Sequence, residues 1–368
     1  MQLDFNPITV DDKKTITSFT LSSPLRNCDL AFSNMCSWRF LYQSEFAVYK
    51  NFLLIRFRIE DKNRIAYMRP IGNGDFKDAL LQLEEDSWQH GHPLLMLGVT
   101  PVSKDLLEEA FPGEFTYIPE RDYFDYIYLR EDLATLKGKK FQAKRNHVNK
   151  FKKQYVYEYV PLTSELIPEC LELEAKWYKA NRTDADQEEL REERQSMIFA
   201  LQHFKELDLM GGAIRIDNQL VAFTFGSPIN QDTFGVHVEK ADTHYDGAYS
   251  IINQEFASRI PEQYLYINRE EDLGIPGLRQ GKFSLTPGRS YPTIRRYCFR
   301  KPPLSKRLNR NKAYGAERSN HPALAVLLRR QRRLYPPFLQ SGLSGSKCLD
   351  AGERRANCLR HAVASLYH

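Results

Sequence analysis

Charged side chains gather in three stretches of this 368-residue sequence, and each stretch has residue types that a reaction or a ligand needs. In the first, residues 234–240, valines alternate with His237 and Glu239, which predicts a strand with these two polar side chains on one face. Glu239 and Lys240 stand at the end of that strand, where α/β sheets commonly bind ligands. The functional interpretation is a general base beside a cation; the alternative is a surface ion pair of little energetic value.

The second stretch, residues 268–282, follows the next predicted strand. It has three consecutive acids, then glycines and a proline that predict a tight turn, and finally Arg279 and Lys282. Acids and bases on a glycine-shaped loop after a strand suit a zwitterionic substrate, although a turn with solvated charges has the same composition. We favour the functional interpretation.

The third stretch, residues 137–153, contains eight basic residues and no acid. On a helix, Phe141, Val148, Phe151 and Tyr155 share one stripe, so the basic residues cover the remaining surface. Such a charge run is usually a solvated face. Close like charges nevertheless repel one another, and the phosphates of a nucleic acid or a lipid head group would relieve that repulsion.

Helices and strands alternate twice along the chain, which predicts an α/β fold with two halves. In the first half we expect helices at residues 9–21, 75–90 and 103–110, with Ser103 as N-cap, and strands at 37–43, 46–49, 52–59, 66–70, 93–99 and 123–129. In the second half we expect helices at 139–155, 164–180, 187–207 and 248–260, and strands at 156–160, 212–216, 220–228, 234–239 and 264–268. The second order matches the acetyltransferase-like (GNAT) layout.

Composition excludes several other classes of protein. With 42% hydrophobic and 27% charged residues the chain is globular, and no apolar run approaches the roughly 20 residues that span a bilayer. The N-terminus does not read as a secretory signal, so we expect a cytoplasmic protein. Six scattered cysteines without a CxxC pair predict reduced thiols and no metal site. Residues 301–368 hold 14 Lys and Arg against three acids, which predicts a disordered basic tail, a nucleic-acid or membrane arm, or out-of-frame translation.

Four stretches together resemble a known family. GKKFQAKRNHVNKF, GGAIRIDNQLVAF, HVEKADTHYDGAYSIINQEFA and NREEDLGIPGLRQGKFS occur in the order seen in the DUF2156 group, which is similar to the C-terminal catalytic domain of phosphatidylglycerol lysyltransferases. The resemblance covers roughly residues 5–284. It implies tandem GNAT-like halves related to the Fem peptidoglycan transferases, with domains at 1–136 and 137–300 and the tail at 301–368. It also implies transfer of an aminoacyl group from aminoacyl-tRNA, without a bound cofactor, to a lipid hydroxyl or a small-molecule acceptor.

The resemblance assigns roles residue by residue. Glu239 and Lys240 match a His-x-Glu-Lys element, and Asp272, Arg279 and Lys282 match an Asp-Leu-Gly-x-x-Gly-Leu-Arg-x-x-Lys element. Glu239 would accept the acceptor proton while Lys240 or Arg279 stabilises the oxyanion. Substrate contacts are expected at His237, Asn253, Glu271, Asp272 and Lys282, with Glu271 or Asp272 binding an ammonium. The tRNA acceptor end or an anionic phospholipid at the inner membrane face would contact Lys140, Lys144, Arg145 and Lys150.

Two other functions remain open from the sequence. A coenzyme A dependent N-acyltransferase would need a pyrophosphate loop before the helix at 248–260, and residues 244–249 match only its first glycine. A binding protein would instead use the basic helix and tail to tether an inactive GNAT scaffold to RNA or membrane.

Overall fold

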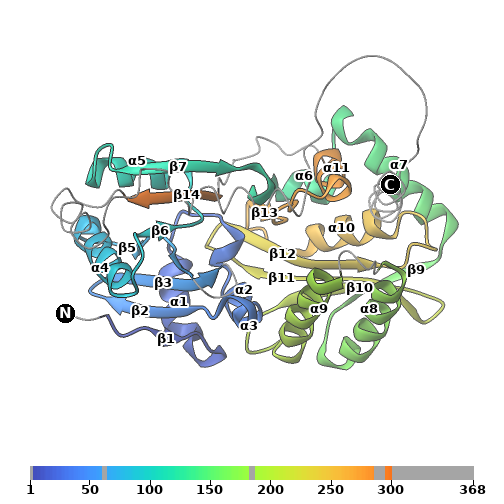
Figure 1. The fold of residues 1–368 in the computed structure, drawn as a ribbon. Helices are drawn as coiled ribbons and strands as arrows, with labels where there is room; N and C mark the ends of the chain where they lie inside the picture. Colours follow the sequence, from blue (N-terminus) through green and yellow to red (C-terminus); the bar gives the residue numbers. More distant parts are fainter. Residues whose placement is uncertain (1–2, 60–63, 182–186, 286–294, 301–368) are drawn as a thin grey trace, which may run out of the picture. The chain divides into compact units, whose positions relative to one another are not determined.

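The structure, a computed structural model, describes residues 3–59, 64–181, 187–285 and 295–300. Two mixed sheets organise these residues (Figure 1). The predicted basic tail, residues 301–368, lies outside the described residues. Within the described part of the chain, no helix combines the length and the apolar character needed to cross a membrane.

The first sheet has the strand order β1-β2-β3-β4-β6-β14-β7, with β5 paired to β3. Its strands are β1 (Asn6–Pro7), β2 (Glu45–Tyr49), β3 (Phe52–Ile59), β4 (Arg64–Tyr67), β5 (Ile71–Gly72), β6 (Leu95–Met96), β7 (Phe115–Glu120) and β14 (Arg295–Arg300). All pairs are antiparallel except β4 with β6. The last strand, β14, lies between β6 and β7, so the chain returns to the first sheet after building the second.

Among the described residues, five helices accompany the first sheet: α1 (Lys13–Thr20), α2 (Phe32–Ser37), α3 (Arg39–Tyr42), α4 (Phe76–Gln89) and α5 (Pro101–Ala110). Helix α6 (Arg130–Thr135) follows and packs against α10 (Ala248–Arg259) of the second half. The predicted strand at 37–43 is wrong, because α2 buries Phe32, Met35 and Cys36 at helical spacing and α3 follows it. The helix at 103–110 begins earlier than predicted, since the Thr100 side chain accepts a hydrogen bond from the Ser103 backbone and caps α5.

The second sheet has the order β8-β13-β12-β11-β10-β9. Its strands are β8 (Ile127–Leu129), β9 (Tyr157–Pro161), β10 (Met210–Ile216), β11 (Gln219–Pro228), β12 (Thr233–Ala241) and β13 (Tyr266–Asn268). The predicted hairpin is confirmed: β10 and β11 pair antiparallel, and Asp217 and Asn218 both have positive φ in the turn. The helices are α7 (Gln142–Gln154), α8 (Ile167–Asn181), α9 (Gln187–Gln202), α10 (Ala248–Arg259) and α11 (Pro276–Ser284). Helices α8 and α9 lie on one face and α10 on the other (Figure 1).

The two parallel strands β12 and β13 pair over only three residues. Residues 233–235 lie opposite residues 266–268, and beyond these residues the two strands are no longer paired. Helix α10 connects the two strands, and α11 begins at Pro276, where the sequence predicted a turn. Beyond the paired residues, Glu239 of β12 and Arg269 after β13 meet through their side chains instead of through strand pairing.

One hydrophobic core joins the two sheets. Alternate residues of β3 face opposite sides, and Leu53 and Ile55 pack in the same cluster as Phe223 and Phe225 of β11. Strand β8 lies in the second sheet and β14 in the first, so both cross the expected boundary at residues 136 and 137. The division into domains 1–136 and 137–300 therefore remains a proposal.

Candidate functional site

A cavity of about 290 Å³ lies where β12 and β13 separate. Its wall includes Lys144 of α7, Glu239 of β12, Asn253 of α10 and Arg269 after β13, together with the first turn of α10. These four side chains, one carboxylate, one amide and two cations, thus come from four different parts of the fold; Asp242 and Asp246 add two further carboxylates to the wall.

Glu239 and Arg269 form a buried ion pair in the cavity wall. Arg269 Nη2 donates to Glu239 Oε1 at 2.9 Å, and each side chain is only 8% exposed. Asn253 Nδ2 donates to the other carboxylate oxygen at 3.3 Å. Because removing either partner would leave a buried charge uncompensated, the pair holds both groups in place at the cavity.

Lys144 faces inward from α7, unlike most basic residues of that helix. Phe141, Val148 and Phe151 form the buried stripe of the helix, and Lys144 lies on it, three residues after Phe141 and four before Val148. The residue is 9% exposed. Burial and, to a smaller extent, the charge of Arg269 lower the pKa of Lys144 to about 8, although Glu239 opposes the shift.

The first turn of α10 lines the same cavity. Its N-cap is Gly247, in the left-handed region with φ +89°, and a Cβ there would lie 3.2 Å from the His147 carbonyl oxygen and 3.4 Å from Phe151 Cβ. A glycine therefore suits both the backbone conformation and the close approach of α7. It has no side chain to cap the helix; the Ala248 N–H donates to the Tyr245 carbonyl oxygen at 3.0 Å, and the next residues, Tyr249 and Ser250, line the cavity.

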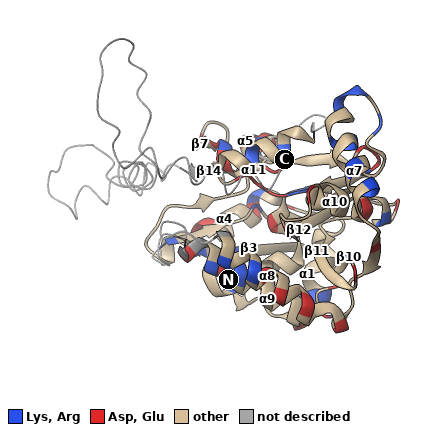
Figure 2. Ribbon diagram, turned by 90° about the vertical axis from the view of Figure 1, so that its right-hand side faces the viewer, with Lys and Arg blue, Asp and Glu red and all other residues tan. Residues whose placement is uncertain are grey.

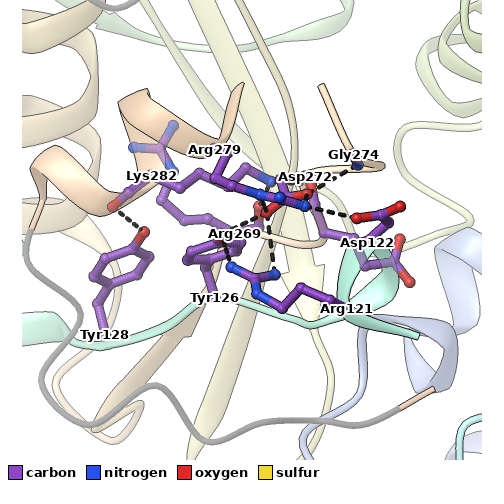
Figure 3. A network of polar contacts seen from close by, with 10 residues as sticks. Arg121, Asp122, Tyr126, Tyr128, Arg269, Asp272, Gly274, Arg279 and Lys282 are labelled. Atoms are coloured by element: carbon purple, nitrogen blue, oxygen red, sulfur yellow. Dashed lines mark hydrogen bonds and ion pairs between the residues drawn. The ribbon is translucent and has the colours of Figure 1, made fainter. Parts of the chain in front are cut away.

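Asp272 organises the loop after β13 (Figure 3). It is fully buried and accepts hydrogen bonds from Arg279 at 2.8 and 2.7 Å, Tyr126 at 2.5 Å, Arg121 at 3.1 Å and the Gly274 backbone at 2.9 Å. Burial favours the neutral acid, but the hydrogen bonds from Arg279, Tyr126 and Gly274 hold the pKa of Asp272 below its usual range. The structure thus places Arg279 and Asp272 together, as a clamp within the loop.

Lys282 holds the same loop through the loop's backbone carbonyl groups. Its ammonium donates to the carbonyl oxygens of Arg269, at 2.6 Å, and Glu271, and burial lowers the pKa of Lys282 to about 8. The carboxylate of Glu271 lies near Cys28 and Asp29: the Cys28 Sγ and one carboxylate oxygen from each acid are all within 4.8 Å of one another. These contacts fix the backbone that carries Arg269 into the cavity.

His237 connects the two halves of the chain. Its Nδ1 lies 2.8 Å from Glu270 Oε1, and its Nε2 lies 2.8 Å from Ser227 Oγ and 3.0 Å from Ser33 Oγ of α2. Its side chain is 6% exposed. The structure thus brings His237 to the junction with α2, whereas Glu239, two residues later, reaches the cavity.

Lys240 faces the opposite side of the sheet from Glu239. Its Nζ lies 2.7 Å from Glu193 Oε1 of α9 and 3.4 Å above the Trp177 ring of α8. The predicted neighbours Glu239 and Lys240 are therefore not brought together at one site, because consecutive strand residues point to opposite faces.

The other predicted anion-binding residues lie on the surface, where Lys and Arg follow α7 (Figure 2). Lys140 pairs with Asp132 at 2.7 Å, and Lys150 pairs with Asp246. Arg145 donates to the carbonyl oxygens of Leu136 and Gly138. Neighbouring acids and carbonyl groups thus offset part of the self-repulsion expected for this helix.

Sequence reasoning missed two features of the cavity. The charge pattern identifies Arg269 only as part of a charged loop, although it directly follows the last predicted strand, and α/β sheets bind ligands at the carboxyl ends of strands. The same pattern groups Lys144 with the surface cations, although its spacing from Phe141 and Val148 places it on the apolar stripe.

Comparisons with known proteins identify the family of this chain. The chain matches the family described as phosphatidylglycerol lysyltransferase, C-terminal, over residues 22–295, and it belongs to that family. A search of curated proteins finds no match. The structure of a conserved protein from Bacteroides thetaiotaomicron, whose function is described as unknown, is 53% identical, with a TM-score of 0.78, covering 82% of this chain and all of the other.

Two further structures are similar in fold. The C-terminal DUF2156 domain described as part of a lysylphosphatidylglycerol synthetase from Agrobacterium fabrum is 12% identical (TM-score 0.56; 82% of this chain, 95% of the other). L-PGS from Bacillus licheniformis is 14% identical (TM-score 0.56; 87% of this chain, 96% of the other). These findings confirm the predicted α/β fold with tandem GNAT-like halves. The family places the chain among the acyl- and aminoacyl-transferases.

Proposed function

We propose that this protein moves an aminoacyl group from aminoacyl-tRNA to the hydroxyl or amine of a lipid or small-molecule acceptor, and that the reaction takes place in the β12–β13 cavity. The observation that carries the proposal is the meeting of Glu239, Arg269 and Lys144 in one cavity. Acyl transfer needs a group that removes a proton from the acceptor and a cation that stabilises the oxyanion.

In the proposed reaction, Glu239 accepts the acceptor proton as the acceptor attacks the ester carbonyl carbon. Arg269, 2.9 Å from Glu239, stabilises the negative charge on the carbonyl oxygen. Arg269 takes the role that the sequence suggested for Lys240 or Arg279, because Lys240 pairs with Glu193 on the other face and Arg279 with Asp272. Asn253 orients the carboxylate of Glu239.

The exposed cations of α7 are the proposed docking surface for the tRNA acceptor end, and a lipid acceptor would bring the protein to the inner membrane face. Lys150 and Lys153 are exposed there. Phosphate contacts of this kind supply most of the sequence-independent affinity for nucleic acids.

A second candidate is a coenzyme A dependent N-acyltransferase. The first turn of α10 lines the cavity, and the N-terminus of a helix favours phosphate groups. The two functions use the same cavity but different donors, so one assay with both donors separates them.

The test uses purified protein, radiolabelled aminoacyl-tRNAs or acetyl-CoA as donors, and total lipid extract or water-soluble amines as acceptors. Glu239→Gln is the matched variant, because it keeps the shape of the side chain and removes its charge. We expect label to move from aminoacyl-tRNA to one acceptor class with the wild type, and at least about 100-fold more slowly with Glu239→Gln.

Transfer only from acetyl-CoA would replace the first function by the second. Binding of tRNA or lipid vesicles without transfer from either donor would favour a scaffold and contradict both enzymatic functions.

A further inference from the structure

A buried lysine stands in the cavity beside the proposed base. Lys144 is 9% exposed and lines the cavity with Glu239 and Arg269. Lys140, just before α7, and Lys150, on α7, lie on the surface and pair with Asp132 and Asp246. The fold therefore separates Lys144 from the basic surface of α7.

The charges around Lys144 favour easy loss of a proton from its ammonium. Burial disfavours the charged form, Arg269 repels it and Glu239 attracts it, so that its pKa is about 8. The other acids of the cavity wall are Asp242 and Asp246, and Asp246 already pairs with Lys150. At pH 7 the protonated form of Lys144 is about ten times more abundant than the neutral amine, so the side chain carries a proton that it can donate readily.

We propose that Lys144 is the general acid that protonates the leaving group of the transfer reaction, as the partner of Glu239. The inference rests on the proposed aminoacyl transfer. The acceptor O–H or N–H bond breaks and its proton goes to Glu239 while the acceptor bonds to the carbonyl carbon. The ester C–O bond to the ribose then breaks, and the Lys144 Nζ proton goes to the ribose oxygen. Transfer of the proton from Glu239 to Lys144 restores both groups.

The other cations near the site lack this property. Arg269 keeps its proton at all accessible pH values, because it is a guanidinium. Lys282 donates to two carbonyl oxygens of the loop, and it does not line the cavity. Among the described residues that line the cavity, Lys144 is the one lysine. The other O–H donors there are the phenols of Tyr245 and Tyr249 and the hydroxyls of Thr243 and Ser250, which are much weaker acids than a phenol.

Leaving-group chemistry tests the assignment. Two donors carry the same aminoacyl group, one as a 3′-ester of adenosine and one as a 4-nitrophenyl ester. The 4-nitrophenolate leaving group departs without a proton, whereas the ribose oxygen needs one. Hydroxylamine is the acceptor for both donors. Lys144→Met should slow transfer from the adenosine ester by about 10² to 10³-fold, and from the 4-nitrophenyl ester by less than about fivefold. Glu239→Gln should slow both donors, and the wild-type rate with adenosine ester should fall above about pH 8, as Lys144 loses its proton.

The outcomes separate the two proposals. If the wild type transfers from neither donor, the proposed function fails, and the role of Lys144 fails with it. If the wild type is active but Lys144→Met slows both donors equally, Lys144 is not the general acid and the proposed function stands. If Tyr245→Phe or Tyr249→Phe slows transfer from the adenosine ester but not from the 4-nitrophenyl ester, that tyrosine is the general acid, and the assignment to Lys144 is overturned.

Discussion

The Asp272 clamp gives a quantitative test of how the loop after β13 is held. Asn in place of Asp272 keeps the side-chain shape but removes the charge that faces both Arg121 and Arg279, and its NH₂ group opposes their N–H donors. Asp272 is fully buried and makes five contacts of 2.5 to 3.1 Å. Arg121 and Arg279 are 38% and 33% exposed and keep part of their hydration, so we expect Asp272→Asn to lower the free energy of unfolding by about 1.5 to 3 kcal/mol, the range for hydrogen bonds to charged groups.

Urea unfolding followed by circular dichroism measures this change. The matched control is Asp122→Asn, because Asp122 is 55% exposed and pairs with the same Arg279 through one contact, so it should cost less than about 1 kcal/mol. The depressed pKa of Asp272 adds a pH dependence: the carboxylate stabilises the fold above about pH 4, and that contribution disappears as the pH falls through the lower, folded-state pKa. Equal costs for the two variants at pH 7 would refute the clamp.

Three further variants test separate parts of the structure. Lys240→Met should change the transfer rate by less than about threefold, because Lys240 contacts α8 and α9 on the far face; a loss comparable to that of Glu239→Gln in the same assay would contradict this placement. Gly226→Ala would place a Cβ 1.9 Å from the Gly235 carbonyl oxygen and should abolish the cooperative thermal transition, whereas Gly113→Ala meets nothing within 4 Å and should cost about 1 kcal/mol. Replacing Lys150 and Lys153 by Glu should reduce the slope of log affinity for tRNA against log salt by about 1.5 to 2, and an unchanged slope would exclude this surface from tRNA binding.

Local patterns of the sequence predicted much of the fold. The hairpin at Asp217 and Asn218, the helix of residues 248–259 and the apolar stripe of α7 depend on turn chemistry and helical spacing, which act between near neighbours. The segment after Ser37 was misassigned, because its alternating aromatic residues imitate a strand. Short alternating runs do not distinguish a strand from the continuation of a helix.

The composition of the cavity depends on contacts between distant residues. The sequence pointed to Glu239, but the pairing of Glu239 with Arg269 joins residues 30 positions apart, and it arises from the short β12–β13 register. Lys240 and Arg279 are held away from the cavity by their ion-pair partners, Glu193 and Asp272. No spacing along the chain encodes those partners.

The position of β14 has a consequence for folding during synthesis. Strands β6 and β7 do not neighbour each other; both pair with residues 295–300, nearly 200 positions later. Until that segment leaves the ribosome, β6 and β7 each present an open edge, and open edges invite pairing with other chains. The first half of this protein is therefore completed last, and a fragment that ends before residue 295 would expose the gap permanently.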